Sequence, residues 1–176
     1  QLGQLGQLGQ PGQPGRPEQD GRPGPLSQLS QSARAELGVG ERTVWMCENP
    51  IVLASAADAL GRGCPPLVCV SGQPSAAVLR LLDLLTADGA RFVYHGDFDW
   101  GGIHIGNGLR ERVPWQPWRF DTQAYLATLA RVTGGELTGR PVEASWDADL
   151  RPALQHHAVR VDEELVLADL IGDLAV

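Results

Sequence analysis

Short apolar runs alternate with amphipathic segments through the middle of the chain, and this alternation limits the fold more than any other feature of the sequence. Apolar runs of strand length occur at 43–47, 67–70 and 91–95. Segments with helical periodicity or helix-capping residues follow them, at 50–60, 74–88 and 101–112. Strands that alternate with helices across short loops form a parallel sheet with helices on its faces. The sequence therefore predicts an α/β fold with a central, mostly parallel sheet.

Four more elements are predicted after residue 112: a short strand at 115–120, a helix at 121–132, and helical segments near 147–158 and 162–174. The end of the chain is also its most acidic part, because residues 141–176 carry two arginines and eight acidic residues. We interpret 141–176 as an acidic helical C-terminal extension. Its charged faces are expected to lie in solvent or to pair with arginines of another subunit.

The beginning of the chain has a different composition. It opens with a three-residue repeat, QLGQLGQLGQPGQPG, and Gln, Gly and Pro dominate the first 25 residues. Such a segment has too few apolar side chains to form a packed core. We therefore expect a disordered low-complexity tail at 1–25 and a linker at 26–42, which leaves 43–140 as the main domain.

The charged residues exclude several classes of chemistry. The chain has 14 basic residues, all of them arginine, and 21 acidic residues, for a net charge of -7. Without lysine, neither a phosphate-binding loop ending in Gly-Lys-Ser/Thr nor a Schiff base can form. The acidic balance argues against a free-standing nucleic-acid binder, which needs basic side chains to neutralise phosphates. A catalytic module held on nucleic acid by another protein or domain remains compatible with it.

Acidic residues follow two of the predicted strands directly. Glu48 comes after the first strand, and Asp97 and Asp99 come after the third. Because functional sites in parallel α/β sheets lie beyond the carboxyl ends of the strands, we expect these three side chains to share one edge. Clustered carboxylates repel one another unless a proton or a cation neutralises them. Mg²⁺, which is bound through oxygen ligands, is the cation that such a group predicts.

Small and polar residues at the same edge are candidates for substrate binding. Gly101 and Gly102 open a predicted helix, and glycines there would allow a phosphate to approach backbone N–H groups at the positive end of the helix dipole. His104 lies two residues further along this helix. Three more candidates follow the second strand: Gly72, Gln73 and Ser75. An acidic metal site beside a helix N-terminus is typical of phosphodiester chemistry.

Structural roles could also explain most of these residues. Glu48 could stabilise the N-terminus of the helix that follows it, and the Asp97–Asp99 turn could be a capping loop. His95 could be a core histidine. Ser71 lacks the Gly-x-Ser-x-Gly context of a nucleophile. Three tryptophans could stack on bases or fill an apolar rim: Trp100, Trp115 and Trp118.

The segments CENP, SGQPS and YHGDFDWGGIHI resemble the Toprim-like C-terminal domain of JetD, the nuclease subunit of Wadjet plasmid-defence systems, and of its uncharacterised bacterial relatives. The chain is similar, more distantly, to the A subunit of topoisomerase VI. The Toprim signature is a Glu after the first strand and Asp-x-Asp after a later strand, which here are Glu48 and Asp97 with Asp99. The resemblance covers roughly residues 40–130. It implies a Toprim-like, Rossmann-like three-layer fold, to which the C-terminal helices are added.

This resemblance also implies roles for the acidic residues. Asp97 and Asp99 would hold Mg²⁺ or Mn²⁺, and Glu48 would be a further ligand or the general acid/base. The loop at 72–75 would lie beside the metal. The chain's two tyrosines, Tyr94 and Tyr125, fall in a predicted strand and a predicted helix. We therefore expect hydrolysis by water rather than a covalent tyrosine intermediate.

The expected function is Mg²⁺-dependent cleavage of DNA by a nuclease-type module of a larger bacterial defence or DNA-processing complex. DNA contact would require an N-terminal domain or partner subunits, with a condensin-like ATPase complex as one such partner. The first alternative is a non-catalytic Toprim-like assembly module. The second is a phosphatase with Asp97 as nucleophile, which the lack of lysine disfavours, since that class uses a lysine to neutralise phosphate.

The cysteines and the hydropathy bear on localisation. The three cysteines (Cys47, Cys64 and Cys69) form no C-x-x-C pair, which predicts neither a zinc knuckle nor a thioredoxin-type site. They indicate a reduced, cytoplasmic protein. The sequence predicts no contact with a membrane, because no apolar stretch approaches the roughly 20 residues that span a bilayer. The start of the chain also lacks the basic and apolar regions of a signal peptide.

Overall fold

A computed structural model of the chain describes residues 39–176. The predicted tail at 1–25 lies outside the described residues, as does most of the predicted linker at 26–42. The secondary structure begins at Thr43 with the first strand and ends at Leu174 with the last helix. The strands and helices predicted between these points are present. Most of their ends differ from the predicted ends by a few residues.

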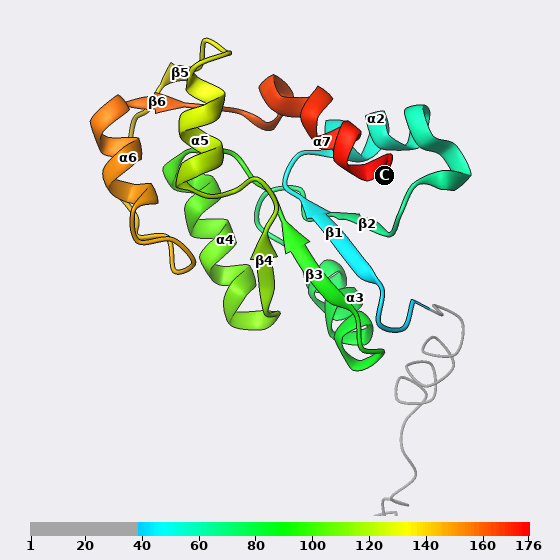
Figure 1. Cartoon of the computed structure of the whole chain (residues 1–176). Helices are drawn as coiled ribbons and strands as arrows, with labels where there is room; N and C mark the ends of the chain where they lie inside the picture. The colour runs from blue at the N-terminus through cyan, green and yellow to red at the C-terminus, as the bar shows by residue number, and fades with distance from the viewer. Residues whose placement is uncertain (1–38) are drawn as a thin grey trace, which may run out of the picture.

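The centre of the molecule is a four-stranded parallel sheet (Figure 1). Its strands are β1 (Thr43–Cys47), β2 (Leu67–Cys69), β3 (Arg91–Tyr94) and β4 (Trp115–Pro117). They lie in the order β2-β1-β3-β4, and every neighbouring pair is parallel. The prediction of an α/β fold with a parallel sheet is confirmed. The strand order makes β1 and β3 neighbours, with Met46 opposite Tyr94.

Helices connect the strands and cover both faces of the sheet, which gives three layers. The connecting helices are α2 (Pro50–Leu60), α3 (Ala76–Ala87) and α4 (Trp100–Arg112). Right-handed crossovers place α2 on one face of the sheet and α3 and α4 on the other, and Figure 1 agrees with this arrangement. The helix α7 (Leu167–Leu174) packs on α2. The helix α5 (Thr122–Leu129) follows β4.

Side chains at the N-caps explain where four of these helices begin. Asn49, Ser75, Asp99 and Asp121 each accept a hydrogen bond from a backbone N–H in the first turn of the helix that follows. Such caps satisfy donors that have no partner inside the helix. Ser75, a candidate for substrate binding, therefore has a structural role at the start of α3.

The core between the sheet and the helices is rich in aromatic rings. Tyr94 packs on Trp115 with ring centroids 5.1 Å apart, and Phe98 packs on Phe120 at the same centroid distance. All four side chains are buried. Trp100 and Trp118 are also buried, at 8% and 4% exposure. The alternative in which Trp100, Trp115 and Trp118 stack on bases is therefore wrong, because these rings are packed inside the protein.

The C-terminal segment is an integral part of the domain. A small antiparallel pair that the sequence did not predict, β5 (Gly135–Glu136) with β6 (Val159–Arg160), joins it to the segment after α5. Between these strands lies α6 (Leu150–His157), and a 3₁₀ turn, η2 (Glu163–Val166), leads into α7. Next to β6, Val161 forms a β-bridge with Phe98, in the turn that carries the two aspartates.

Two ion pairs that the sequence did not predict join the last helix to the arginines that flank α5. Asp169 pairs with Arg131 at 2.7 Å, and Asp173 pairs with Arg119 at 2.5 Å. Both arginines belong to the same chain, next to α5. These two residues of α7 therefore pair with arginines of their own chain, because the C-terminal segment folds back over the arginines that flank α5.

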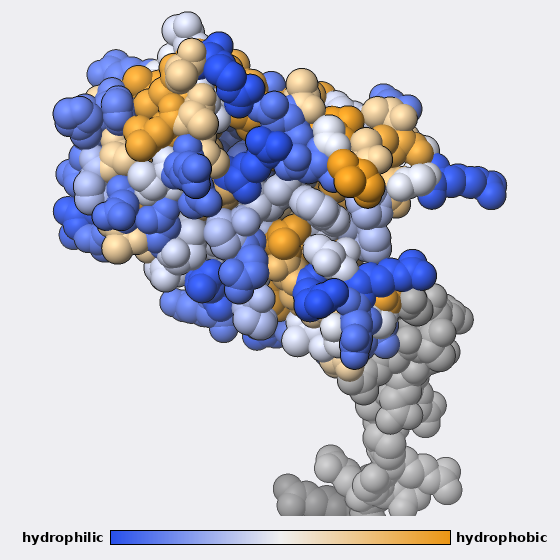
Figure 2. Space-filling view, in the orientation of Figure 1, coloured by the Kyte–Doolittle hydropathy of each residue, from blue (hydrophilic) through white to orange (hydrophobic). Residues whose placement is uncertain are grey.

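The surface seen in Figure 2 is mostly hydrophilic, with small apolar areas between the polar side chains. Among residues 39–175, the exposed large apolar side chains belong to α2, α5 and η2: Ile51, Leu53, Leu126 and Leu165. Single apolar residues of this kind are normal on protein surfaces. Within residues 39–176, no helix combines the length and the apolar character that crossing a membrane requires.

Two glycines of α4 allow a test of this packing. A Cβ atom at position 102 would lie 2.1 Å from the carbonyl oxygen of Asp97, whereas a Cβ at position 108 would meet nothing within 4 Å. We expect Gly102→Ala to lower the free energy of unfolding by about 2 kcal/mol, because the backbone must shift. Gly108→Ala should raise it by up to about 1 kcal/mol through helix propensity. Denaturant titration measures both, and equal stability of the two variants would contradict the tight packing at Gly102.

Candidate functional site

The carboxyl ends of β1 and β3 bring two of the predicted site residues into contact. Glu48 directly follows β1, and one of its carboxylate oxygens (Oε2) accepts a hydrogen bond from the backbone N–H of Asp97 at 3.3 Å. This contact joins residues 49 positions apart in the sequence. Glu48 does not cap the helix α2, because the side chain of Asn49 performs that role by accepting from the N–H of Ile51 at 3.0 Å.

Asp99 lies in the same turn and caps the helix α4. Its Oδ1 atom accepts a hydrogen bond from the N–H of Gly102 at 2.7 Å. The charge of Asp99 acts on Glu48 and Asp97, since it raises the pKa of both carboxyl groups. Asp99 is thus both a helix cap and part of the acidic group. The N–H of Gly102, which was a candidate for contact with phosphate, is engaged by this cap.

A third segment contributes an acidic residue that the sequence did not single out. Glu163 is fully buried, and its carboxylate accepts hydrogen bonds from the backbone N–H groups of Glu48, at 3.1 Å, and of Asn49. Its own N–H donates to Oδ1 of Asp97 at 2.7 Å. We call Glu48, Asp97, Asp99 and Glu163 the acidic cluster. A run of three acids, DEE at 162–164, was the only sequence signal for Glu163, and it is more typical of a solvated surface.

Burial and mutual repulsion favour the protonated forms of these groups. Burial raises the pKa of Glu163 to about 9, of Glu48 to about 7 and of Asp97 to about 6. The neighbouring carboxylates add to each of these shifts. None of the ion pairs formed within residues 39–176 includes a member of the acidic cluster. The cluster is therefore a partly buried acidic site without a cationic side chain to neutralise it.

A polar atom without a partner lies beside the cluster. The hydroxyl of Tyr94 is buried and makes no hydrogen bond in the described part of the chain. A Cβ atom built at Gly96 would lie 2.7 Å from this hydroxyl and 3.0 Å from Oε2 of Glu48. The two oxygens therefore border the same small space, and only glycine at position 96 leaves it open. An orphaned hydroxyl beside carboxylates is consistent with a site that takes a further polar partner.

The acidic cluster suits a hard divalent cation by its chemistry, because all of its side-chain ligands are oxygens. The present geometry of the cluster, however, is not that of a metal site. Among residues 39–176, no three or more His, Cys, Asp or Glu side chains are gathered in an arrangement ready to hold a metal ion. All four carboxylates are instead turned towards backbone N–H groups, which belong to Glu48, Asn49, Asp97, Gly102 and Glu163. Metal binding would require these carboxylates to rotate.

The other candidates for substrate binding make no hydrogen bond to the cluster within the described residues. Gln73 and Gly101 are exposed, and so is His104 on α4. Gly72 has a φ of 73°, which allows the loop after β2 to turn. His95 is a core histidine: burial lowers its pKa to about 4, and Nδ1 lies 2.8 Å from the carbonyl oxygen of Trp118.

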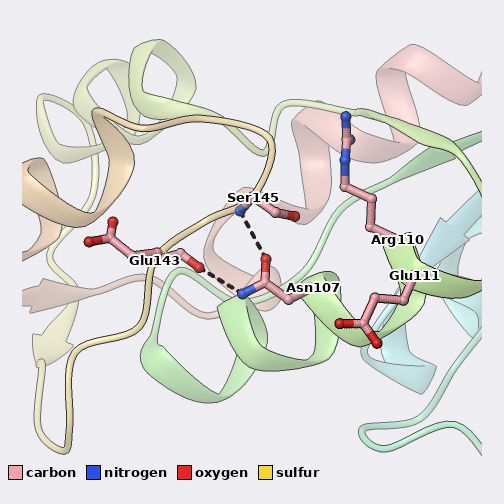
Figure 3. A pocket seen from close by; sticks show the side chains of 5 residues that line it. All are labelled: Asn107, Arg110, Glu111, Glu143 and Ser145. Carbon is pink, nitrogen blue, oxygen red and sulfur yellow. Dashed lines mark hydrogen bonds between the residues drawn. The ribbon is translucent and has the colours of Figure 1, made fainter.

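A separate hollow of about 410 Å³ lies at the far end of α4 (Figure 3). It is lined by Asn107, Arg110, Glu111, Glu143 and Ser145. The amide of Asn107 bridges this hollow, since it donates to the carbonyl of Glu143 and accepts from the N–H of Ser145. Asn107 and Asp99 are eight residues apart on α4, which is about 12 Å along the helix axis. The hollow is therefore distinct from the acidic cluster.

The raised pKa of Glu163 predicts a specific dependence of stability on pH. A carboxyl group whose pKa is higher in the folded state binds a proton on folding, so stability falls as pH rises between the unfolded and folded pKa values. Glu163, with a pKa of about 9, titrates at higher pH than Glu48 and Asp97, whose pKa values are about 7 and about 6. In the presence of a metal chelator, the free energy of unfolding of the wild type should fall more steeply with rising pH than that of Glu163→Gln. The two slopes should differ by up to about 1 kcal/mol per pH unit.

Denaturant titrations at several pH values measure this difference in slope. The matched control is Glu136→Gln, which changes an exposed glutamate on β5 and should follow the wild type. The glutamine at position 163 cannot accept both backbone hydrogen bonds, so a lower stability at all pH values is expected. Parallel curves for the wild type and Glu163→Gln between pH 7 and 9 would contradict the raised pKa.

The sequence of almost all of the described residues matches one protein family. Residues 25–174 match the family described as "Protein of unknown function C-terminus (DUF2399)". The match spans the parallel sheet and the C-terminal segment, and it therefore contains every member of the acidic cluster. No curated protein matches the chain. The chain belongs to the family of proteins of unknown function C-terminus, DUF2399.

Proposed function

We propose that the acidic cluster binds Mg²⁺ or Mn²⁺ and that the chain is a Toprim-like nuclease module that performs metal-dependent phosphodiester chemistry on DNA. One observation carries the proposal: four carboxylates from three segments meet at the carboxyl edge of the sheet without a cationic side chain. A bound divalent cation would neutralise them and would stabilise charge on a phosphate.

The acidic residues have distinct roles in this proposal. Asp97 and Asp99 would hold the cation after their carboxylates rotate away from the backbone N–H groups that they now accept from. Glu48 is a further ligand or the general acid/base, a role that suits a carboxyl group whose pKa is about 7. The unpartnered hydroxyl of Tyr94 supports a polar occupant beside Glu48.

The choice of DNA as substrate rests on the resemblance to the C-terminal domain of JetD and its bacterial relatives. The net charge of -7 means that this chain does not supply the basic surface for DNA by itself. We propose that an N-terminal domain or partner subunits, such as a condensin-like ATPase complex, hold the DNA. The module would then work in the cytoplasm, as part of a defence or DNA-processing complex.

A non-catalytic assembly module is the second candidate. It is favoured by one observation: the carboxylates of the cluster already accept backbone hydrogen bonds, and no ready-made metal arrangement exists within residues 39–176. In that case the cluster joins the C-terminal segment to the sheet and stays protonated. The two candidates differ in whether the cluster takes up a cation.

Calorimetric titration with Mg²⁺ and with Mn²⁺ separates the two candidates. We expect binding to the wild-type chain and a loss of affinity of about tenfold or more in Asp99→Asn, because one ligand loses its charge. Asparagine caps helices as well as aspartate does, so the helix α4 should remain. The matched control is Asp121→Asn, which changes the equivalent cap of α5, a residue that is not a member of the cluster, and should bind as the wild type does. Absence of binding heat in the wild type would support the assembly module.

Cleavage of DNA tests the activity itself. In the complete chain with its partner subunits, Asp97→Asn and Asp99→Asn should each reduce divalent-dependent cleavage by at least about 100-fold, since each removes a ligand of the ion. Asp121→Asn should cleave at the wild-type rate. A gel assay of plasmid DNA, with and without chelator, measures these rates. Wild-type cleavage by Asp97→Asn would contradict the proposed role of the cluster.

A further inference from the structure

Two cysteines face each other across the neighbouring strands β1 and β2. Cys47 and Cys69 are register partners in this parallel pair. Neighbouring strands lie about 4.8 Å apart, which is within the range of about 4.4–6.8 Å between the Cα atoms of disulfide-bonded cysteines. Side chains of paired residues also lie on the same face of a sheet. The backbone therefore places the two sulfur atoms for bond formation without a change of register.

The side chains confirm that the two thiols converge. The sulfur of Cys47 lies 3.7 Å from the carbonyl oxygen of Asn49, and the sulfur of Cys69 lies 3.3 Å from the carbonyl oxygen of Glu48. Both thiols thus point to the same short segment after β1. Both cysteines are free thiols in this structure.

The two thiols differ in solvent accessibility, and this difference sets the order in which they would react with an oxidant. Cys47 is fully buried, whereas Cys69 is partly exposed. A small oxidant in solvent therefore reaches the sulfur of Cys69 first. Cys47 is then the nearest thiol that can react with the oxidised sulfur, and it is shielded from the oxidant itself. This division resembles that of attacking and resolving thiols in redox-active pairs.

We propose that Cys47 and Cys69 are a modification site, a dithiol that hydrogen peroxide converts into an intramolecular disulfide. The sulfur of Cys69 attacks the peroxide, so that an S–O bond forms, the O–O bond breaks and hydroxide leaves. The sulfur of Cys47 then attacks the sulfenic acid of Cys69, so that an S–S bond forms and the oxygen leaves as water. In total, two thiols and one peroxide give one disulfide and two waters.

The reaction would change the contacts of the acidic cluster. The thiol of Cys69 donates to the carbonyl of Glu48, and formation of the disulfide removes this donor. A thiol reductant would restore it by exchange. The chemistry of the site itself does not depend on the proposed nuclease function, so it can be tested without a DNA substrate or a metal.

The test uses the full chain in which Cys64, the third cysteine, is changed to serine. The folded protein is treated with hydrogen peroxide, alkylated in denaturant and digested with trypsin near neutral pH. Cleavage after Arg42, Arg62 and Arg80 separates the two cysteines into peptides 43–62 and 63–80. We expect these peptides to be linked, with an intact monomer 2 Da lighter than the reduced chain. Dithiothreitol should abolish both signals.

The control variants are Cys47→Ser and Cys69→Ser in the Cys64→Ser background. Cys47→Ser should give oxygen adducts on Cys69 in place of the linked peptides, and Cys69→Ser should leave Cys47 unmodified because it is buried. If these variants fold poorly, the peroxide-treated wild-type chain with all three cysteines should give the same linked pair of peptides, and fragmentation of the linked pair should place the bond at Cys69 rather than Cys64. Sulfinic acid on Cys69 without a disulfide, linkage between two chains, or two thiols that remain fully alkylated would each overturn the proposal.

Discussion

The parallel pairing of β1 with β3 at the centre of the sheet is the interaction on which the site depends. It sets the residues that follow the two strands side by side, so that Glu48 reaches the backbone of Asp97. The C-terminal segment is then held on this edge by Glu163, whose carboxylate bonds to the β1 side and whose N–H bonds to the β3 side. One edge of the sheet thus gathers three segments that are remote in sequence.

This gathering has an electrostatic cost. Burial of several carboxylates without a cationic partner is unfavourable unless protons or a cation neutralise them, and the raised pKa values of Glu48, Asp97 and Glu163 express that cost. Natural proteins retain such arrangements mainly where they serve a function. The same edge holds the unpartnered hydroxyl of Tyr94 and the thiols of Cys47 and Cys69. These features make this edge the chemically distinctive part of the molecule.

The predictions that rested on local interactions were accurate. The strand at Thr43–Cys47 and the helix beginning at Pro50 were predicted within a residue, because apolar runs, caps and glycine stops act over a few positions. The predictions for the C-terminal segment were less accurate. The pairing of β5 with β6 depends on residues about 25 positions apart, and no short-range pattern encodes it. The ion pairs of Arg119 and Arg131 with α7 were missed for the same reason.

The sequence alone determined the α/β class, the caps of α2 and α5, and the placement of Glu48, Asp97 and Asp99 after strands, since periodicity and capping are local properties. Only the tertiary structure decided that β1 lies next to β3 and that Glu163 is buried against both. It also decided that Trp115 belongs to the core. Burial and proximity depend on how distant segments pack together, so residues of the same type can become a solvated acid, a helix cap or part of a buried cluster.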